Sequence, residues 1–240
     1  KEDRSITSLP IYYSYGLSVL NTHLACGASI TVTDESVISA KFWDLVRDSS
    51  VTSLAGVPYT YQLLDKLKFE NIDAKSINVL TQAGGRLEPK YVEKFAKTMN
   101  ERGGRFFVMY GQTEATARIS VLPSDQALSK SASIGKPLPG GEIELVNVTD
   151  GIGELQYSGP NVSMGYAEKA SDLALGDTNK GVLKTGDLAS QDENGFFYVH
   201  GRTDRYFKIH GSRVNLSEIE TLLSEFNTEC VALGSDNQLV

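Results

Sequence analysis

The sequence predicts an α/β protein: a partly parallel sheet with flanking helices, then a β-rich subdomain and the start of a small α+β C-terminal domain. In the first half, short apolar runs alternate with amphipathic stretches of helical length. This alternation is typical of βαβ units with parallel strands. After residue 117 the apolar runs are separated by glycine-rich turns with little helix between them. We therefore expect an α/β subdomain at 1–120, a β-rich subdomain at 121–203, and a hinge with the start of a C-terminal domain at 204–240.

The elements of the first half follow from local patterns. Leu9–Leu17 suggests a strand that runs into an aromatic loop, and leucines at helical spacing then predict a short helix that ends at Gly27. Pro58 and Pro89 stand near the starts of two further helices, where proline is tolerated. Strands are expected at 28–33, 51–55, 77–81 and 106–109, and helices at 40–48, 59–67 and 88–100.

The second half predicts strands at 142–148, 153–158 and 196–199, and another that ends at Thr185–Gly186–Asp187. A charge-rich turn at 202–205 suggests a domain boundary or a hinge. Ser217 predicts the N-cap of an amphipathic helix over 218–226, because Glu220 follows three residues later and completes a capping box.

Composition excludes several classes of protein. The formal charge of −7 argues against a nucleic-acid partner, since phosphate backbones attract basic surfaces. Cys26 and Cys230 lie far apart and outside any CxxC pattern, which argues against a disulfide scaffold or a zinc site. No signal peptide is present, and no apolar run approaches the ~18 residues of a membrane span. We expect a cytoplasmic protein with no membrane span.

A loop with chemically useful side chains follows the apolar run at 106–109. Ligands of open α/β sheets bind beyond the carboxyl ends of the strands, so Tyr110, Thr113 and Glu114 are expected to point into a crevice. An aromatic ring can stack on a base, a hydroxyl can bond a phosphate oxygen, and a carboxylate can hold magnesium. On this segment alone, an ordinary polar exit from a strand is an equal alternative.

Other segments carry weaker signals. Backbone at Gly84 and Gly85 could approach a flat ring from the face opposite Tyr110, although a tight turn is the commoner use of such a pair. The tyrosines at 12, 13 and 15 are either core residues or one wall of a small-molecule pocket. Asp187 could hold the two hydroxyls of a ribose, or it could cap its own turn.

In this order and at this spacing, the motifs resemble those of the adenylate-forming superfamily, which comprises acyl-CoA synthetases, carrier-protein ligases, peptide-synthetase adenylation domains and luciferases. The resemblance spans nearly the whole chain. It rests on Tyr-Gly-Gln-Thr-Glu at 110–114, Gly-Glu-Leu-Gln at 153–156 with Gly159 and Gly165–Tyr166, Thr-Gly-Asp at 185–187, Gly-Arg-Thr-Asp at 201–204, and Lys-Ile-His-Gly-Ser-Arg at 208–213.

The resemblance implies a reaction. A substrate carboxylate attacks the α-phosphorus of ATP with the help of magnesium, which gives an acyl-adenylate and pyrophosphate. The acyl group then usually passes to a thiol, of CoA or of a carrier protein. Both reactants are anionic, so positive charge and in-line positioning matter more than a covalent nucleophile.

The resemblance also implies residue roles around the nucleotide. Tyr110 would stack on adenine opposite the backbone of Gly84, Gly85 and Arg86. Thr113 and Glu114 would be catalytic, the first by bonding the α-phosphate and the second by binding magnesium. Gly111, Gln112 and Lys208 would complete the ATP/AMP site.

Further roles are implied for the second half and for the acid. Asp187 would hold the ribose hydroxyls, and Arg202 would reach the ribose and phosphate region. Asp204 would be the hinge of the C-terminal domain. Tyr13 and Gly56 would line the pocket for the carboxylic acid.

The chain also departs from the family pattern. The Ser/Thr/Gly-rich phosphate loop that should precede Leu9 is missing, and the chain does not reach the family's catalytic lysine beyond Val240. We therefore expect a fragment that is inactive alone. Val108 stands where some relatives have asparagine. His210 and Asn215 replace a common arginine and a common acid, and the Lys-Ile-His-Gly form resembles D-alanine carrier-protein ligases, which hints at an amino or short acyl acid.

Two other functions stay open. The chain could be a nucleotide-binding regulatory module without turnover, and a luciferase-type oxidative fate lies within the resemblance. A dehydrogenase is disfavoured because no GxGxxG follows a strand. His23, His200 and His210 are expected to be solvated or bonded to backbone rather than catalytic.

Overall fold

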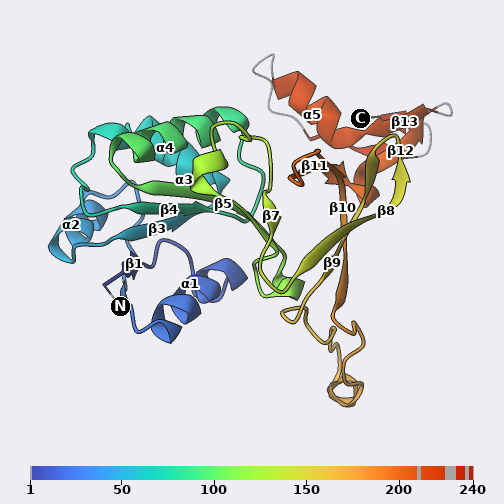
Figure 1. The fold of residues 1–240 in the computed structure, drawn as a ribbon, viewed down its shortest axis with the longest axis horizontal. Coiled ribbons are helices and arrows are strands. Elements are labelled where there is room, and N and C mark those ends of the chain that lie inside the picture. Colours follow the sequence, from blue (N-terminus) through green and yellow to red (C-terminus); the bar gives the residue numbers. More distant parts are fainter. Residues whose placement is uncertain (1, 210–211, 225–230, 236–237, 240) are drawn as a thin grey trace. The chain divides into compact units, whose positions relative to one another are not determined.

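The computed structural model describes residues 2–209, 212–224, 231–235 and 238–239. The chain forms two compact units (Figure 1). The first unit comprises Lys1–Glu142 and Ser158–Leu183, and the second comprises Ile143–Tyr157 and Lys184–Val240. Among the described residues, no helix combines the length and the apolar character needed to cross a membrane.

A seven-stranded mixed sheet organises the first unit. Its strand order is β2-β1-β3-β4-β5-β6-β7, in which β2 to β5 are parallel while β6 and β7 are antiparallel to their neighbours. The strands are β1 (Arg4–Ile6), β2 (Ser29–Thr31), β3 (Ser53–Gly56), β4 (Val79–Gln82), β5 (Arg105–Tyr110), β6 (Ser120–Leu122) and β7 (Lys136–Pro137).

Helices cover both faces of this sheet. Helices α2 (Ala40–Asp48), α3 (Pro58–Lys66) and α4 (Pro89–Glu101) lie on one face, and α1 (Ser14–Ala25) lies on the other (Figure 1). An aromatic core holds the three-helix layer to the sheet: the Tyr61 ring lies 4.9 Å from that of Phe95 and 5.3 Å from that of Phe106, between centroids. The α/β expectation is confirmed.

The first predicted strand was misplaced. The chain forms β1 at Arg4–Ile6, and α1 already begins at Ser14, so Leu9–Leu17 is not a strand. The N–H of Tyr13 donates to the carbonyl of Pro10 (3.1 Å) in a turn that leads into the helix. Gly16 allows this arrangement, because a Cβ there would lie 2.2 Å from the Pro10 carbonyl oxygen.

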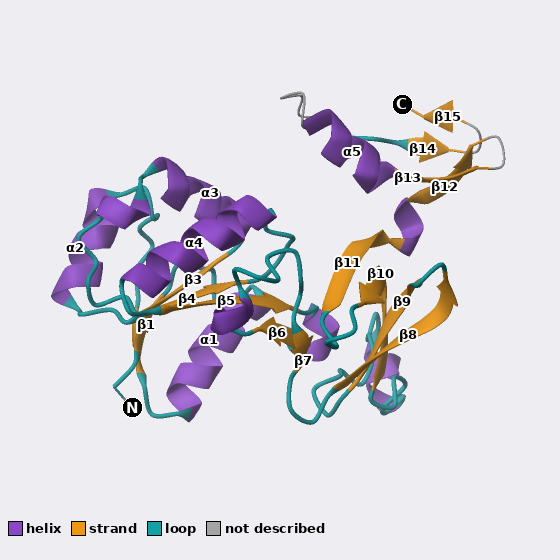
Figure 2. Ribbon diagram, turned by 45° about the horizontal axis from the view of Figure 1, so that its top comes forward, coloured by secondary structure: helices purple, strands orange, loops and turns teal. Residues whose placement is uncertain are grey.

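A four-stranded sheet organises the second unit, in the order β11-β10-β9-β8 (Figure 2). Its strands are β8 (Glu142–Thr149), β9 (Ile152–Ser158), β10 (Val182–Gln191) and β11 (Phe197–Arg202). Smaller elements follow, namely β12 (Tyr206–Ile209), β13 (Ser212–Asn215), α5 (Leu216–Ser224), β14 (Gly234–Ser235) and β15 (Gln238–Leu239). The β-rich second half is confirmed.

Two predictions in the second unit were wrong. Asp187 does not end a strand but lies inside β10, which continues to Gln191 after a register shift at Leu188/Ala189. Helix α5 begins at Leu216, so Ser217 lies within it and not at its N-cap. The Glu220 carboxylate accepts hydrogen bonds from Arg205 (2.6 Å) and from the N–H of Ala232 (2.9 Å). The end of this predicted helix, 225–226, lies outside the described residues.

Short 3-10 turns complete the fold: η1 (Phe69–Asn71), η2 (Thr113–Ala115), η3 (Ser124–Gln126), η4 (Ala170–Ala174) and η5 (Thr203–Arg205). The turn η2 carries two of the predicted site residues.

Candidate functional site

The carboxyl ends of β3, β4 and β5 meet at one edge of the first sheet. Gly56 pairs with Gln82, and Gln82 pairs with Val108, in continuous parallel register. The loops that follow these strands therefore leave from the same edge, which brings residues 84–86 and 110–114 into one region, as ligand sites of parallel sheets require.

The loop after β4 needs its two glycines. Gly84 and Gly85 have φ angles of +79° and +153°, which residues with a side chain rarely adopt. A Cβ at Gly84 would lie 2.4 Å from the hydroxyl oxygen of Tyr13, and one at Gly85 would lie 3.1 Å from Pro58. The buried Gln82 side chain donates to the Gly85 carbonyl at 2.8 Å and fixes the turn. This turn presents exposed backbone at the edge of the sheet.

The loop after β5 is closed at its base. The N–H of Ile119 donates to the Tyr110 carbonyl at 2.8 Å, where β6 returns beside β5. A Cβ at Gly111 would lie 2.2 Å from the Ala117 carbonyl oxygen, so only glycine fits at this position. We refer to residues 110–119 as the signature loop.

The two residues predicted to be catalytic lie on η2 in this loop. Thr113 is exposed and shares a hydrogen bond of 3.0 Å with the Ser14 hydroxyl at the start of α1. The Tyr166 hydroxyl donates to the Glu114 carboxylate, and this hydrogen bond raises the pKa of Tyr166. The N–H of Ser163 donates to the Glu114 carbonyl at 2.7 Å.

The surroundings of Glu114 fit a magnesium ion that is held mainly by a ligand. Within the part of the chain that the structure describes, no three His, Cys, Asp or Glu side chains gather as a metal cluster. Mg²⁺ is commonly bound by one or two carboxylates together with substrate phosphates and water. A single carboxylate beside an exposed hydroxyl is consistent with that mode.

Sequence reasoning missed Asn161, which braces the signature loop. Its amide donates to the carbonyls of Ala115 (2.7 Å) and Arg118 (3.0 Å), and its own carbonyl accepts from the Thr116 hydroxyl (2.8 Å). Thr116 and Ala117, which lie between these two carbonyls in the chain, have φ angles of +53° and +70°, a costly conformation for residues with a Cβ. No local pattern could predict this contact, because the partners are 43 to 46 residues apart.

The three tyrosines near the N-terminus separate into different roles. Tyr15 is 2% exposed, donates to the carbonyl of Thr81 (3.0 Å), and has a pKa raised above its usual value by burial. Tyr12 is 91% exposed. Tyr13 is half-buried, with its hydroxyl against Gly84. Gly56 is buried against Thr60 and Tyr61, each 3.0 Å from where its Cβ would be, so its glycine also serves the packing of α3.

The second unit brings its own predicted residues together. Asp187 on β10 pairs with Arg202 on β11, and the Arg202 guanidinium lies 3.7 Å from the Asp187 carboxylate. Gly186, with φ of +73°, leaves room for that guanidinium, since a Cβ would lie 3.1 Å from Nη2. The Thr185 hydroxyl accepts from the N–H of Asp187 (3.1 Å) and donates to the Leu155 carbonyl (2.7 Å).

For three of the predicted positions the structure does not describe the side chain. Asp204 is described only by its backbone, in η5, and Lys208 only by its backbone, in β12. His210 lies outside the described residues.

Comparison with known proteins decides the family. The model of a family described as "AMP-binding enzyme" matches residues 1–167. This chain belongs to that family. The resemblance to adenylate-forming enzymes is thereby confirmed.

Among curated relatives of this chain, the 2-succinylbenzoate–CoA ligase of Oceanobacillus iheyensis is 30% identical over 246 residues, which cover 98% of this chain and 49% of the relative. Among solved structures, the o-succinylbenzoate CoA synthetase of Bacillus subtilis with its acyl-adenylate OSB-AMP has a TM-score of 0.81 and 26% identity, over 98% of this chain and 49% of that one. The same enzyme with ATP and magnesium has a TM-score of 0.81 and 27% identity, over 99% and 50%. The chain spans about half the length of the curated relatives it matches.

Proposed function

We propose that the protein activates a carboxylic acid with ATP and magnesium, as an acyl-adenylate, and transfers the acyl group to the thiol of CoA. The observation that carries this proposal is the convergence of the glycine loop at 84–86 and the signature loop at one edge of a parallel sheet. Relatives that are CoA ligases support a thiol acceptor. A carrier-protein phosphopantetheine offers the same thiol chemistry. We keep the expected subdomains, 1–120, 121–203 and 204–240, and a cytoplasmic location as predictions.

Adenine recognition is assigned to the first unit. Tyr110 stacks on the base, and the exposed backbone of Gly84, Gly85 and Arg86 lies against its other face. A base has a flat apolar surface and polar edges, so a ring and a peptide plane suit it. Gly111 and Gln112 extend this surface towards the phosphates.

Phosphate chemistry is assigned to η2. The Thr113 hydroxyl donates to an α-phosphate oxygen, and the Glu114 carboxylate holds magnesium. The ion would neutralise phosphate charge as an acid oxygen bonds to the α-phosphorus and the bond to pyrophosphate breaks. Tyr166 and Ser163 hold Glu114 in place for this task.

Ribose recognition is assigned to the second unit. The Asp187 carboxylate, only 11% exposed, accepts hydrogen bonds from the ribose hydroxyls, with Arg202 beside it and Lys208 farther along the chain. Asp204 is the proposed hinge. Tyr13 and Gly56 are the proposed lining of the acid pocket.

A pyrophosphate-release screen of the whole protein tests this function, with amino, short-chain, long-chain and aryl acids as substrates. Glu114→Gln should lower kcat by about 100-fold or more, because it removes the carboxylate charge that holds magnesium, and the ion stabilises the transition state more than the ground state. Glu101→Gln, at the exposed end of α4, is the matched control and should leave kcat unchanged. Binding of AMP without pyrophosphate release from any acid would instead indicate a regulatory nucleotide-binding module.

A further inference from the structure

Arg118, in the signature loop, has an unusual side chain. Its Nε is fully buried and has no hydrogen-bond partner. Across the described residues, its guanidinium donates no hydrogen bond and forms no ion pair. Burial lowers the pKa of this guanidinium, and the nearby Tyr15 hydroxyl opposes the effect in part. A half-buried cation therefore lies beside α1 without a described counter-charge.

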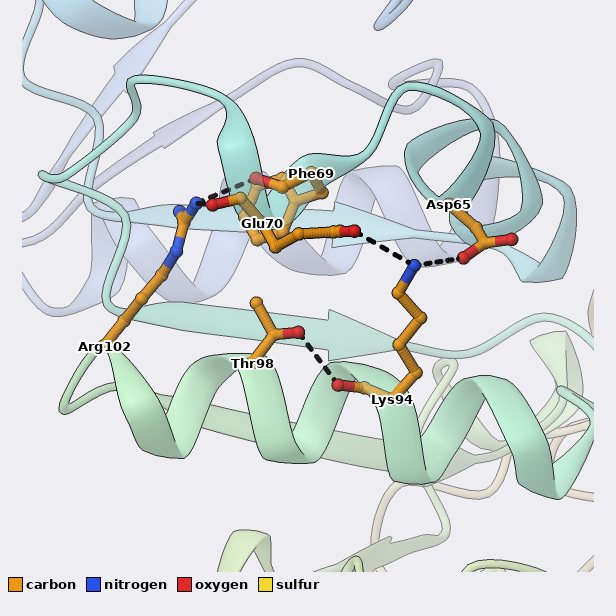
Figure 3. A network of polar contacts seen from close by, with 6 residues as sticks. All are labelled: Asp65, Phe69, Glu70, Lys94, Thr98 and Arg102. Atoms are coloured by element: carbon orange, nitrogen blue, oxygen red, sulfur yellow. Dashed lines mark hydrogen bonds and ion pairs between the residues drawn. The ribbon is translucent and has the colours of Figure 1, made fainter.

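Arg102 shows what a structural arginine looks like in the same unit. One of its Nη atoms donates to the carbonyls of Phe69 (2.8 Å), Glu70 (3.0 Å) and Ile72 (3.2 Å), although the other has no partner. Its guanidinium also lies 4.5 Å from the centre of the Phe69 ring (Figure 3). Arg118 has none of these contacts, although its chemistry is the same.

The backbone of Arg118 is held firmly at the candidate site. Its carbonyl accepts from Asn161, and its nitrogen lies 2.8 Å from the position that a Cβ on Gly111 would take. The loop thus carries two charges with different neighbours. The Glu114 carboxylate is bonded to Tyr166, whereas the Arg118 guanidinium lies near Tyr15, which follows Tyr13 and Ser14 in the chain.

A half-buried guanidinium whose buried Nε has no partner is incompletely compensated, and a carboxylate is the group that best compensates it, through paired charge-assisted hydrogen bonds. We propose that Arg118 binds a second carboxylate of the acid, so that the substrates are acids with one carboxylate for activation and another for recognition. This inference rests on the proposed function for the reacting carboxylate, but the binding of a diacid can be measured without turnover.

Calorimetry on the whole protein, saturated with AMP, tests the proposal. The probes are succinate, glutarate, adipate and phthalate, each compared with its monomethyl ester, which keeps one carboxylate. At least one diacid should bind about 30-fold more tightly than its ester, as expected for a desolvated charge pair. If no diacid is preferred, the proposal is overturned.

Substitutions at Arg118 test whether the preference for the diacid depends on its guanidinium. Arg118→Gln should lower the affinity for the preferred diacid about 30-fold and change that for its ester by less than about threefold, while Arg118→Lys restores part of the loss. Arg102→Gln is the matched control, which should lower the melting temperature and leave the ratio of the two affinities unchanged. An equal loss for diacid and ester in Arg118→Gln would overturn the proposal.

A stability measurement excludes a purely structural role. Arg118→Met should melt at or above the wild-type temperature, because it removes a partly desolvated cation whose buried Nε has no partner. A clear drop would show that Arg118 has a partner within the protein, and would overturn the inference. If diacids bind in an Arg118-dependent way but no acid releases pyrophosphate, the proposed function fails and this binding site stands.

Discussion

At the scale of single residues, Asn161 determines the shape of the signature loop. Its amide bonds the carbonyls on either side of Thr116 and Ala117, which both adopt left-handed conformations. Glycine would occupy such positions without a steric cost, but neither residue is glycine. The energy of this strained turn is therefore offset by contacts from a segment distant in the sequence.

Asn161→Ala should lower the free energy of unfolding by about 2 kcal/mol, because two carbonyls lose their donor. In an Ala117→Gly background the same change should cost less, by roughly 1 kcal/mol, since the turn then needs less bracing. Urea unfolding of the single and double variants measures both values, with Asn100→Ala on the exposed face of α4 as the control. Strict additivity of the two changes would contradict this account.

At the scale of elements, prediction succeeded where the apolar pattern was long. The helix expected at 40–48 is α2, Ala40–Asp48, and the strands expected at 51–55, 77–81 and 106–109 correspond to β3, β4 and β5. β1 was missed because its three residues, Arg-Ser-Ile, contain one large apolar side chain and no period. The helix start at Leu216 was missed because a serine with a glutamate three residues later also occurs inside helices.

An ion-pair group joins α4 to α3 and η1 (Figure 3). The Lys94 ammonium lies 2.5 Å from the Asp65 carboxylate and 3.4 Å from that of Glu70. The hydrogen bond to Asp65 raises the pKa of Lys94 above its usual 10.5. The charged form is thus favoured in the folded state, so the pair stabilises fully below pH 10.5 and loses this contribution as the pH rises through the higher folded value.

Lys94→Met should lower the free energy of unfolding by up to about 1 kcal/mol at neutral pH, the range of partly exposed pairs. The difference from wild type should shrink at pH values above the raised pKa. Urea unfolding at neutral and strongly alkaline pH gives the comparison, with the exposed Lys97→Met on the same helix as the control. A difference that stays constant with pH would show that Lys94 acts through its methylenes.

At the scale of the whole molecule, the order of the motifs along the sequence was enough to predict the family. The contacts between segments that are distant in the sequence could not be predicted. The sequence places Tyr110, Thr113 and Glu114 after a strand, and the structure has them at the edge shared by β3, β4 and β5. The roles of Asn161 and Arg118 depend on neighbours from other segments. Such contacts have no period or spacing in the sequence.

Nucleotide binding should stabilise the folded molecule as a whole. A ligand at a concentration 100 times its Kd adds about 2.7 kcal/mol to the free energy of unfolding. AMP should therefore raise the melting temperature, and Asp187→Asn should reduce this rise by weakening the hold on the ribose. Asp150→Asn, in the exposed turn between β8 and β9, is the control and should keep the full rise. If AMP raises the melting temperature of Asp187→Asn as much as that of the wild type, Asp187 does not bind the ribose.

The closed base of the signature loop has a consequence for engineering. Because β5 and β6 join at Tyr110 and Ile119, the ten residues between and including them enter and leave the sheet at a single point. We expect that such a segment can be exchanged between homologous proteins as one module when the residues that hold it are exchanged with it. Asn161, Ser163 and Tyr166 hold the signature loop in its conformation. An exchange that leaves out residues 161–166 would therefore transfer the sequence of the motif but not its conformation.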